Sequence, residues 1–361
     1  MPVRASIGEK LARSRFDADR KFTIHPAPRL HSVTPRQYAE PWFFVRDPAG
    51  PFVKAFTEAF YKPFFRATGI RPVRVTGGVE PTAMIRDMVD RRDYAWDVAL
   101  VSKSCHLALT TYGADYLEPL EPVTTAMPAE YRSSFFSGND VYANVLAYRT
   151  DSFAGRTAPG GWADFWNVGD FPGRRSLRNH PMDTVEEALL ADGVALGQLC
   201  PYDLGRAFDS LARIRPYIDT WWSGAAIQTR LLTSGRIDLC AVSSIRAQHA
   251  IESGAPVGIA WQGNIRSVEG WVILKGTPKR ELCRRFVAFV ADAQRQAVFA
   301  RYINSSPTLP GAQAHLDPER AALMPDAHRD QAAASDAQYW AQHKDALVDR
   351  FTAWRRQRTA S

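Results

Sequence analysis

A carboxylate stands at the start of a short apolar segment near residue 270. Glu269 lies two residues before Trp271, which opens the run WVIL, and such a run is typical of a buried strand. Burying a carboxylate beside a tryptophan is costly unless a partner binds it. Two kinds of partner remain open: the ammonium group of a ligand, or a neighbouring guanidinium of Arg246 or Arg266. We therefore expect Glu269 to recognise a cation.

Other residues able to bind a small molecule stand where expected strands end and loops begin. Three of these loops, at residues 76–78, 102–104 and 223–224, precede helices, and the free N–H groups at a helix N-terminus suit a carboxylate or phosphate. The candidate ligand-binding residues are Asp47, Thr76, Gly77, Gly78, Ser102, Lys103, Arg178, Trp222, Ser244, Arg246, Glu269 and Trp271. Glycine lets a ligand approach the backbone closely, and tryptophan can wall an aliphatic chain or cover an ammonium group.

The charges in these loops favour a zwitterion. A site for a pure polyamine would be rich in carboxylates, whereas the candidate loops hold the cations Arg46, Lys103, Arg178 and Arg246 against the anions Asp47 and Glu269. An amino acid derivative, a γ-aminobutyrate-like compound or an aminoalkyl phosphonate fits this mixture. Glu269 would bind the cationic end, and Arg178 or a helix N-terminus the anionic end.

Several of these residues have purely structural alternatives. Arg178 could pair with Asp183 rather than with an anion, and residues 76–78 could form only a tight turn. Consecutive strand residues face opposite sides, so Trp221 and Trp222 cannot both line a cleft. Either Trp222 lines the cleft with Trp221 in the core, or the reverse holds.

The elements around these residues alternate between strand and helix. Strands are expected at residues 41–45, 71–75 and 96–102, each followed by a helix start, and a capping box formed by Asp183 and Glu186 marks a helix that ends at Gly193. Two extended segments, at residues 141–150 and 267–274, separate two such blocks. We predict an α/β fold of two lobes joined by two hinge crossovers, with the ligand outside the carboxyl ends of the strands.

The expected organisation has four parts. Residues 1–40 form an irregular lead-in, residues 41–147 and 269–310 form lobe one, and residues 148–268 form lobe two. Residues 311–361 form C-terminal helices that pack on the lobes.

Composition excludes several classes of protein. The chain of 361 residues has a net charge of +7 that is spread along it, which argues against a nucleic-acid-binding face. No stretch approaches the ~20 apolar residues of a membrane span, and the first 34 residues contain no apolar signal-peptide core. The four cysteines are far apart, which indicates neither a zinc site nor a disulfide framework, and we expect no metal and no cofactor.

The chain resembles a known family through segments that occur in a fixed order. These are AFYKPFFRATGIRPVRVTGG, WDVALVS, GGWADFWNVGDFPGRRSLR, DTVEEALLADGV, TWWSGA, LLTSGRIDL and EGWVILKGTPK. Together they are similar to the polyamine/γ-aminobutyrate-type solute-binding proteins of bacterial ABC importers. The resemblance implies a two-lobed type II periplasmic-binding fold, a small amine or zwitterion as ligand, permease and ATPase subunits as partners, and a monomer in the periplasm, without catalytic residues.

An enzyme on the same fold is the alternative. Cys105 lies beside His106 at the end of an expected strand, and some thiamin-related enzymes with this fold use a cysteine in the cleft. Such an enzyme would act inside the cell on a small heterocycle or a thiamin-related compound, which the missing signal peptide would suit. Adjacent residues point in different directions, so His106 is a poor base for Cys105.

Overall fold

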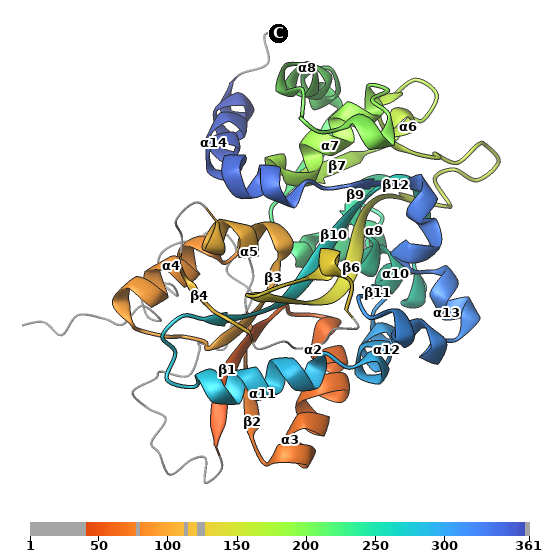
Figure 1. Cartoon of the computed structure of the whole chain (residues 1–361). Helices are drawn as coiled ribbons and strands as arrows, with labels where there is room; N and C mark the ends of the chain where they lie inside the picture. The colour runs from red at the N-terminus through yellow and green to blue at the C-terminus, as the bar shows by residue number, and fades with distance from the viewer. Residues whose placement is uncertain (1–40, 77–79, 112–114, 121–126, 358–361) are drawn as a thin grey trace, which may run out of the picture.

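The computed structural model describes residues 41–76, 80–111, 115–120 and 127–357 (Figure 1). The predicted lead-in, residues 1–40, and the predicted site residues Gly77 and Gly78 lie outside these ranges. None of the helices in the described ranges has the length and apolar character needed to cross a bilayer.

Lobe one is built on three parallel strands: β1 (Trp42–Asp47), β2 (Arg71–Thr76) and β3 (Val98–Ser102). One face is covered by α2 (Phe52–Phe56), the π-helical turn η1 (Thr57–Tyr61), α3 (Lys62–Thr68), α11 (Arg280–Val290) and α12 (Ala293–Tyr302). The other face is covered by α4 (Thr82–Arg91) and α5 (Lys103–Thr110). The phenylalanines spaced four apart from Phe52 to Phe64 form the predicted apolar face. All four are buried in the hydrophobic core that α2, η1 and α3 form with α11 and α12.

Two long antiparallel strands connect the lobes. They are β6 (Phe136–Arg149) and β10 (Val257–Leu274), and they lie side by side at the centre of one continuous sheet with the order β2-β1-β3-β10-β6-β9-β7-β8. Figure 1 shows both strands running from one lobe into the other. The two predicted crossovers are therefore present, and each strand extends beyond the apolar run that indicated it.

Lobe two has the parallel strands β7 (Arg175–Arg178), β8 (Ile218–Trp222) and β9 (Leu239–Ser243). Its helices are α6 (Trp162–Trp166), α7 (Pro181–Ala191), α8 (Leu204–Ile214), α9 (Ala225–Thr233) and α10 (Ser244–Glu252). Asp183 and Glu186 do not form the predicted capping box of α7, so that prediction was wrong. His180 caps the helix through a bond from the Met182 N–H, and Asp183 has a left-handed backbone with a φ of 71°.

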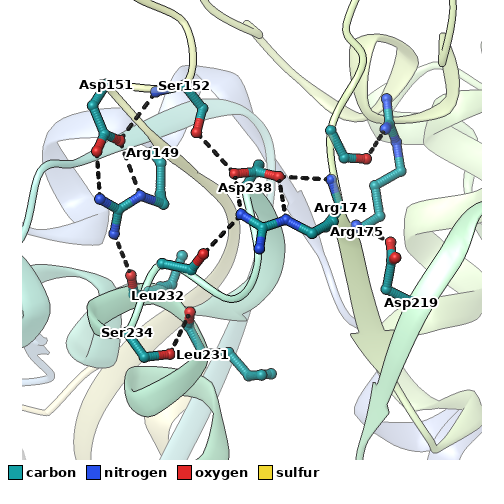
Figure 2. A network of polar contacts seen from close by, with 12 residues as sticks. Arg149, Asp151, Ser152, Arg174, Arg175, Asp219, Leu231, Leu232, Ser234 and Asp238 are labelled. Atoms are coloured by element: carbon teal, nitrogen blue, oxygen red, sulfur yellow. Dashed lines mark hydrogen bonds and ion pairs between the residues drawn. The ribbon is translucent and has the colours of Figure 1, made fainter.

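A polar network closes the end of lobe two that lies away from the hinge (Figure 2). Asp238, just before β9, accepts hydrogen bonds from Arg174 and from the Ser152 hydroxyl, while the Arg175 N–H at the start of β7 binds Asp219. Burial alone would raise the pKa of Asp238, but the bonds from Arg174 and Ser152 lower it to about 2. The charges at the amino ends of these strands are thus paired within the lobe.

The C-terminal region returns from lobe one to lobe two. After α12 come the short elements β11 (Ser306–Pro307), η5 (Pro310–His315), α13 (Pro318–Ala322) and η6 (Pro325–Gln331), and then β12 (Ala332–Ala334) pairs with β10. The last helix, α14 (Ala337–Arg356), buries Trp340, Leu347 and Phe351 in the cores of lobe two.

Candidate functional site

The strand ends of both lobes meet the hinge within a few residues of one another. Ser102, the last residue of β3, is opposite Glu269 of β10, and Ser243, the last residue of β9, is opposite Asn144 of β6. Asp140 of β6 is the other neighbour of Glu269. Loops and helix N-termini that follow the strands of both lobes therefore converge on this stretch of the hinge.

Glu269 and Asp140 form a pair of carboxyl groups on the two hinge strands. Opposite residues of antiparallel strands project to the same face, with their Cβ atoms about 5 Å apart. Burial and the charge of Asp140 raise the pKa of Glu269 to about 8, although Arg46 acts against them. Burial also raises the pKa of Asp140 to about 6, while hydrogen bonds from Asn139 and Ser305 act against the rise. This pair would gain from a cation.

Neither arginine that the sequence offers as a partner for Glu269 takes that role. Arg266 forms an ion pair with Asp326. Arg246, whose pKa is lowered by burial, lies over the ring of Phe52 at 6.0 Å and beside Gly50 in lobe one, where an added Cβ would be 3.6 Å from its Nη1. Arg246 thus belongs to a contact between the lobes.

A cation–anion pair from lobe two lies close to the hinge carboxyls. Arg178 Nη1 is 2.5 Å from Asp183 Oδ2, so the local pairing that the sequence left open is formed. Tyr142 of the hinge strand β6 lies near this pair: burial, Asp183 and Glu269 raise its pKa, and Arg178 and a hydrogen bond with Ser267 oppose the rise. The protonated Tyr142 hydroxyl is therefore a donor near the carboxyl groups of Asp183 and Glu269.

Lobe one contributes Arg46, which lies near Glu269. Its Nη1 donates to the Leu100 carbonyl at 2.7 Å. Burial lowers the pKa of Arg46, and among the groups that counteract this effect are the charges of Glu269 and Glu80. Both carboxylates hence lie near one guanidinium. Glu80 in turn binds Lys344 of α14, with Nζ 2.6 Å from Oε2.

A cavity of about 640 Å³ opens between the lobes; Tyr142 belongs to its lining, whereas Glu269, Asp140, Arg46 and Arg178 are not among the described residues that line it. Its walls come from α5 of lobe one, from Met182 of α7, from the hinge strands and from the start of α14. Two predicted site residues, Ser102 and Lys103, line it together with Tyr142. The volume suits a small molecule.

Other predicted site residues make contacts within the protein. Asp47 is held by Arg74 and by Tyr61, whose hydroxyl lies 2.5 Å from Oδ2. Ser102 Oγ caps α5, and Lys103 Nζ donates to the Glu130 carbonyl at 2.7 Å.

Two further predicted site residues lie at other strand ends. Ser244 Oγ accepts from the Ala143 N–H, and Thr76 is exposed at the end of β2. The hydrogen bonds of Asp47, Ser102, Lys103 and Ser244 therefore hold the loops and strand ends in place.

The two tryptophans proposed to line the cleft have buried side chains. Trp271 is 0% exposed among the aromatic rings of lobe one, and its Nε1 donates to Asn139 Oδ1 at 3.0 Å. Trp222 is 5% exposed and donates to the Ala241 carbonyl, with the Arg178 guanidinium 5.8 Å from its ring. Trp221 packs against α14. Trp222 therefore backs the site through Arg178.

Comparison with known proteins identifies the family. The model for bacterial extracellular solute-binding proteins matches residues 59–326. The chain belongs to this family. A gamma-aminobutyric acid-binding protein of Pseudomonas aeruginosa is 34% identical over 308 residues, covering 82% of this chain and 86% of the relative.

Solved structures agree with this assignment. An ABC transporter substrate-binding protein from Bradyrhizobium japonicum is 31% identical with a TM-score of 0.82, covering 87% of this chain and 99% of the other. The Atu4243-GABA receptor is 29% identical with a TM-score of 0.79, covering 88% and 98%. The two-lobed fold and the resemblance inferred from the sequence are confirmed, and the molecule is a solute-binding protein of the ABC-transporter type.

The enzyme alternative finds no support in the environment of Cys105. The side chain of Cys105 is buried in lobe one, and burial together with the charge of Glu80 raises the pKa of its thiol. Nucleophilic cysteines need the opposite shift. Burial lowers the pKa of His106 to about 4, and its Nε2 binds Ser133 rather than the thiol.

The sequence alone did not single out several members of this solute-binding protein's charged cluster. Asp140 stands just before an apolar segment, which is the same signal that marked Glu269, and could have been found in that way. Asp183 was expected either to cap a helix or to pair with Arg178, and the pair is formed. Glu80 and Lys344 are 264 residues apart, and no local pattern connects them.

Proposed function

We propose that this solute-binding protein captures a small zwitterionic amine of the ω-amino acid class between its lobes and delivers it to an ABC permease. The observation that carries the proposal is the opposition of charges at the lobe boundary. The Glu269–Asp140 pair would gain from a cation, and Arg178 and Arg46 lie close to it. A ligand with an ammonium at one end and a carboxylate at the other complements this arrangement.

In this proposal Glu269 accepts the ammonium group in its ionised form, and Asp140 adds a second negative charge. Arg178 or the amino ends of α5 and α7 would receive the carboxylate. Tyr142 would donate to either end. The similarity to proteins named for γ-aminobutyrate binding supports the same ligand class.

The wider role follows from the family. We infer that the protein acts as a monomer in the periplasm and that its partners are the permease and ATPase subunits of an importer. The proposal includes no nucleic acid, metal or cofactor.

Calorimetric titration with 4-aminobutyrate, 5-aminopentanoate, putrescine and spermidine tests the ligand class. We expect the ω-amino acids to bind at least tenfold more tightly than the polyamines. Mass spectrometry after release should recover the ligand unchanged. Absence of ω-amino acid binding, or chemical turnover that Cys105→Ser abolishes, would overturn the proposal.

A further inference from the structure

The C-terminal helix α14 brings a lysine across the lobe boundary. Trp340, Leu347 and Phe351 fix α14 in the cores of lobe two. Lys344, between Trp340 and Leu347, instead reaches lobe one, where its Nζ lies 2.6 Å from Glu80 Oε2 and 3.3 Å from Thr82 Oγ1. In Figure 1 the helix passes above α5 of lobe one. An alkylammonium group from one lobe is thus bound by a carboxylate and a hydroxyl of the other.

Glu80 is ionised in this pair. Burial would raise its pKa, but the charge of Lys344 and the bonds from Lys344 and Thr82 lower it below its ordinary value. The side chain of Lys344 is only 14% exposed and that of Glu80 is 30% exposed, so solvent only partly screens the pair. The ammonium group of Lys344 therefore already binds and neutralises the carboxylate of Glu80.

The pair belongs to the same charged region as Glu269. Thr82 Oγ1, which binds Lys344, lies 3.2 Å from Cys105 Sγ. The Cys105 N–H donates to Ser102 Oγ, and Ser102 is opposite Glu269. The charges of Glu80 and Glu269 also both act on Arg46. Lys344 also acts on His180, the residue that caps α7 of lobe two beside Arg178. The lysine ammonium consequently stands at the lobe boundary, within the electrostatic reach of both sides of the site.

We infer that Lys344 makes the site select ligands with one ammonium group over diamines of the same length. This inference rests on the proposed function, because it assumes that the ligand's ammonium binds at Glu269. Glu80 is then the second carboxylate to which the far ammonium of a diamine could bind, and Lys344 already neutralises it. The far end of the ligand meets Lys344 and Arg178, which attract a carboxylate and repel a second ammonium.

Two ligands that differ at only one end test the inference. Putrescine and 4-aminobutyrate share an ammonium and a short chain, and 1-aminobutane has the ammonium alone. In Lys344→Met, which keeps an unbranched apolar side chain, we expect putrescine to bind at least tenfold more tightly and 4-aminobutyrate at least fivefold more weakly, with 1-aminobutane nearly unchanged. The ratio of the two dissociation constants, measured by calorimetry, is the readout.

Lys275→Met is the matched control. Lys275 follows β10 at the end of lobe one that lies away from the hinge, where it pairs with Asp115. Its loss removes one positive charge and one ion pair and should leave the ratio unchanged. A change equal to that of Lys344→Met would show that net charge alone explains the effect.

Glu80→Gln provides a second measurement that does not depend on the folding of the lysine variant. It leaves Lys344 without its counter-charge, so the preference for 4-aminobutyrate over putrescine should increase. In the double variant Lys344→Met/Glu80→Gln the gain in putrescine binding should disappear. Unchanged ratios in either single variant of a protein that binds ω-amino acids would overturn the inference. If the unsubstituted protein binds no ω-amino acid, the proposed function fails first.

Discussion

The raised pKa of Glu269 makes ligand binding depend on pH, which can be tested directly. In the unliganded protein Glu269 has a pKa of about 8, so it is mostly protonated at pH 7. A protonated carboxyl group cannot form an ion pair with an ammonium, so the ligand must displace this proton. Burial raises this pKa most, the charge of Asp140 from β6 adds to the rise and Arg46 from lobe one opposes it, while Tyr142 remains neutral nearby.

The size of the effect follows from the distance between pH and pKa. Ionising a group of pKa about 8 at pH 7 costs about 1.4 kcal/mol, which weakens binding roughly tenfold. The affinity for 4-aminobutyrate should therefore rise about tenfold per pH unit up to pH 8 and level off above it. The ligand's ammonium, with a pKa of about 10, stays charged over this range.

Calorimetry in buffers with different ionisation enthalpies measures the displaced proton. At pH 7 we expect release of about 0.9 proton per ligand bound, and at pH 9 about 0.1. Glu269→Gln should lose the pH dependence and bind about 2–5 kcal/mol more weakly at high pH, which is thirtyfold or more. Asp140→Asn should move the midpoint to lower pH, because a negative charge beside Glu269 is removed.

Two results would refute this reasoning. An affinity that stays constant between pH 6 and pH 9 would show that Glu269 is not the group that receives the ammonium. A pH dependence that persists in Glu269→Gln would assign the titration to another residue.

Further expectations concern stability, the anionic end of the ligand, closure and the last helix. Because folding raises the pKa of Glu269 from 4.5 to about 8, the free energy of unfolding of the unliganded protein should fall as the pH rises through this window. Glu269→Gln should reduce this fall. Denaturation that gives the same free energy of unfolding at pH 5 and at pH 9 would contradict the expectation. Arg178→Gln should weaken 4-aminobutyrate more than 1-aminobutane, whereas Arg174→Gln, in the distant network, should affect neither; equal losses for both ligands would exclude Arg178 from carboxylate binding. X-ray scattering should show a smaller radius of gyration with ligand than without, and identical curves at saturation would argue against closure. Trp340→Phe removes the donor to Glu186 Oε1 and should lower the free energy of unfolding by about 1–3 kcal/mol; an unchanged value would show that the bond is replaced.

The hinge strands could be found from the sequence, but their length could not. The apolar runs at residues 141–150 and 267–274 predicted two extended segments, and both lie in hinge strands. The strands continue into polar residues such as Ser137 and Asp140 of β6 and Arg266 of β10, because pairing between β6 and β10 satisfies the backbone whatever the side chains are. Hydrophobic periodicity contains no information about such pairing.

The sequence could reveal the role of Glu269 but not that of Lys344. A carboxylate next to an apolar run is unusual, so the local sequence indicates it. A lysine in an amphipathic helix is ordinary, and periodicity assigns it to the solvent. Only the docking of α14 places Lys344 beside Glu80, and docking depends on contacts between residues far apart in the chain. The capping-box pattern at Asp183 failed similarly, because the pair with Arg178 takes its carboxylate.

The return of the chain through β12 has a mechanical consequence. Within the described ranges the polypeptide crosses between the lobes three times, in β6, in β10 and again from β12 into α14. These three segments lie next to one another at residues 265–266 of β10. Two connecting segments would let the lobes twist relative to each other as well as bend about the hinge. Three connecting segments paired in one sheet resist rotation of one lobe about the axis that joins the lobes, because such twisting would break the hydrogen bonds between the segments. Bending across the sheet leaves those bonds in place. The lobes should therefore move along a single angular coordinate, so that one interlobe distance is enough to follow opening and closing.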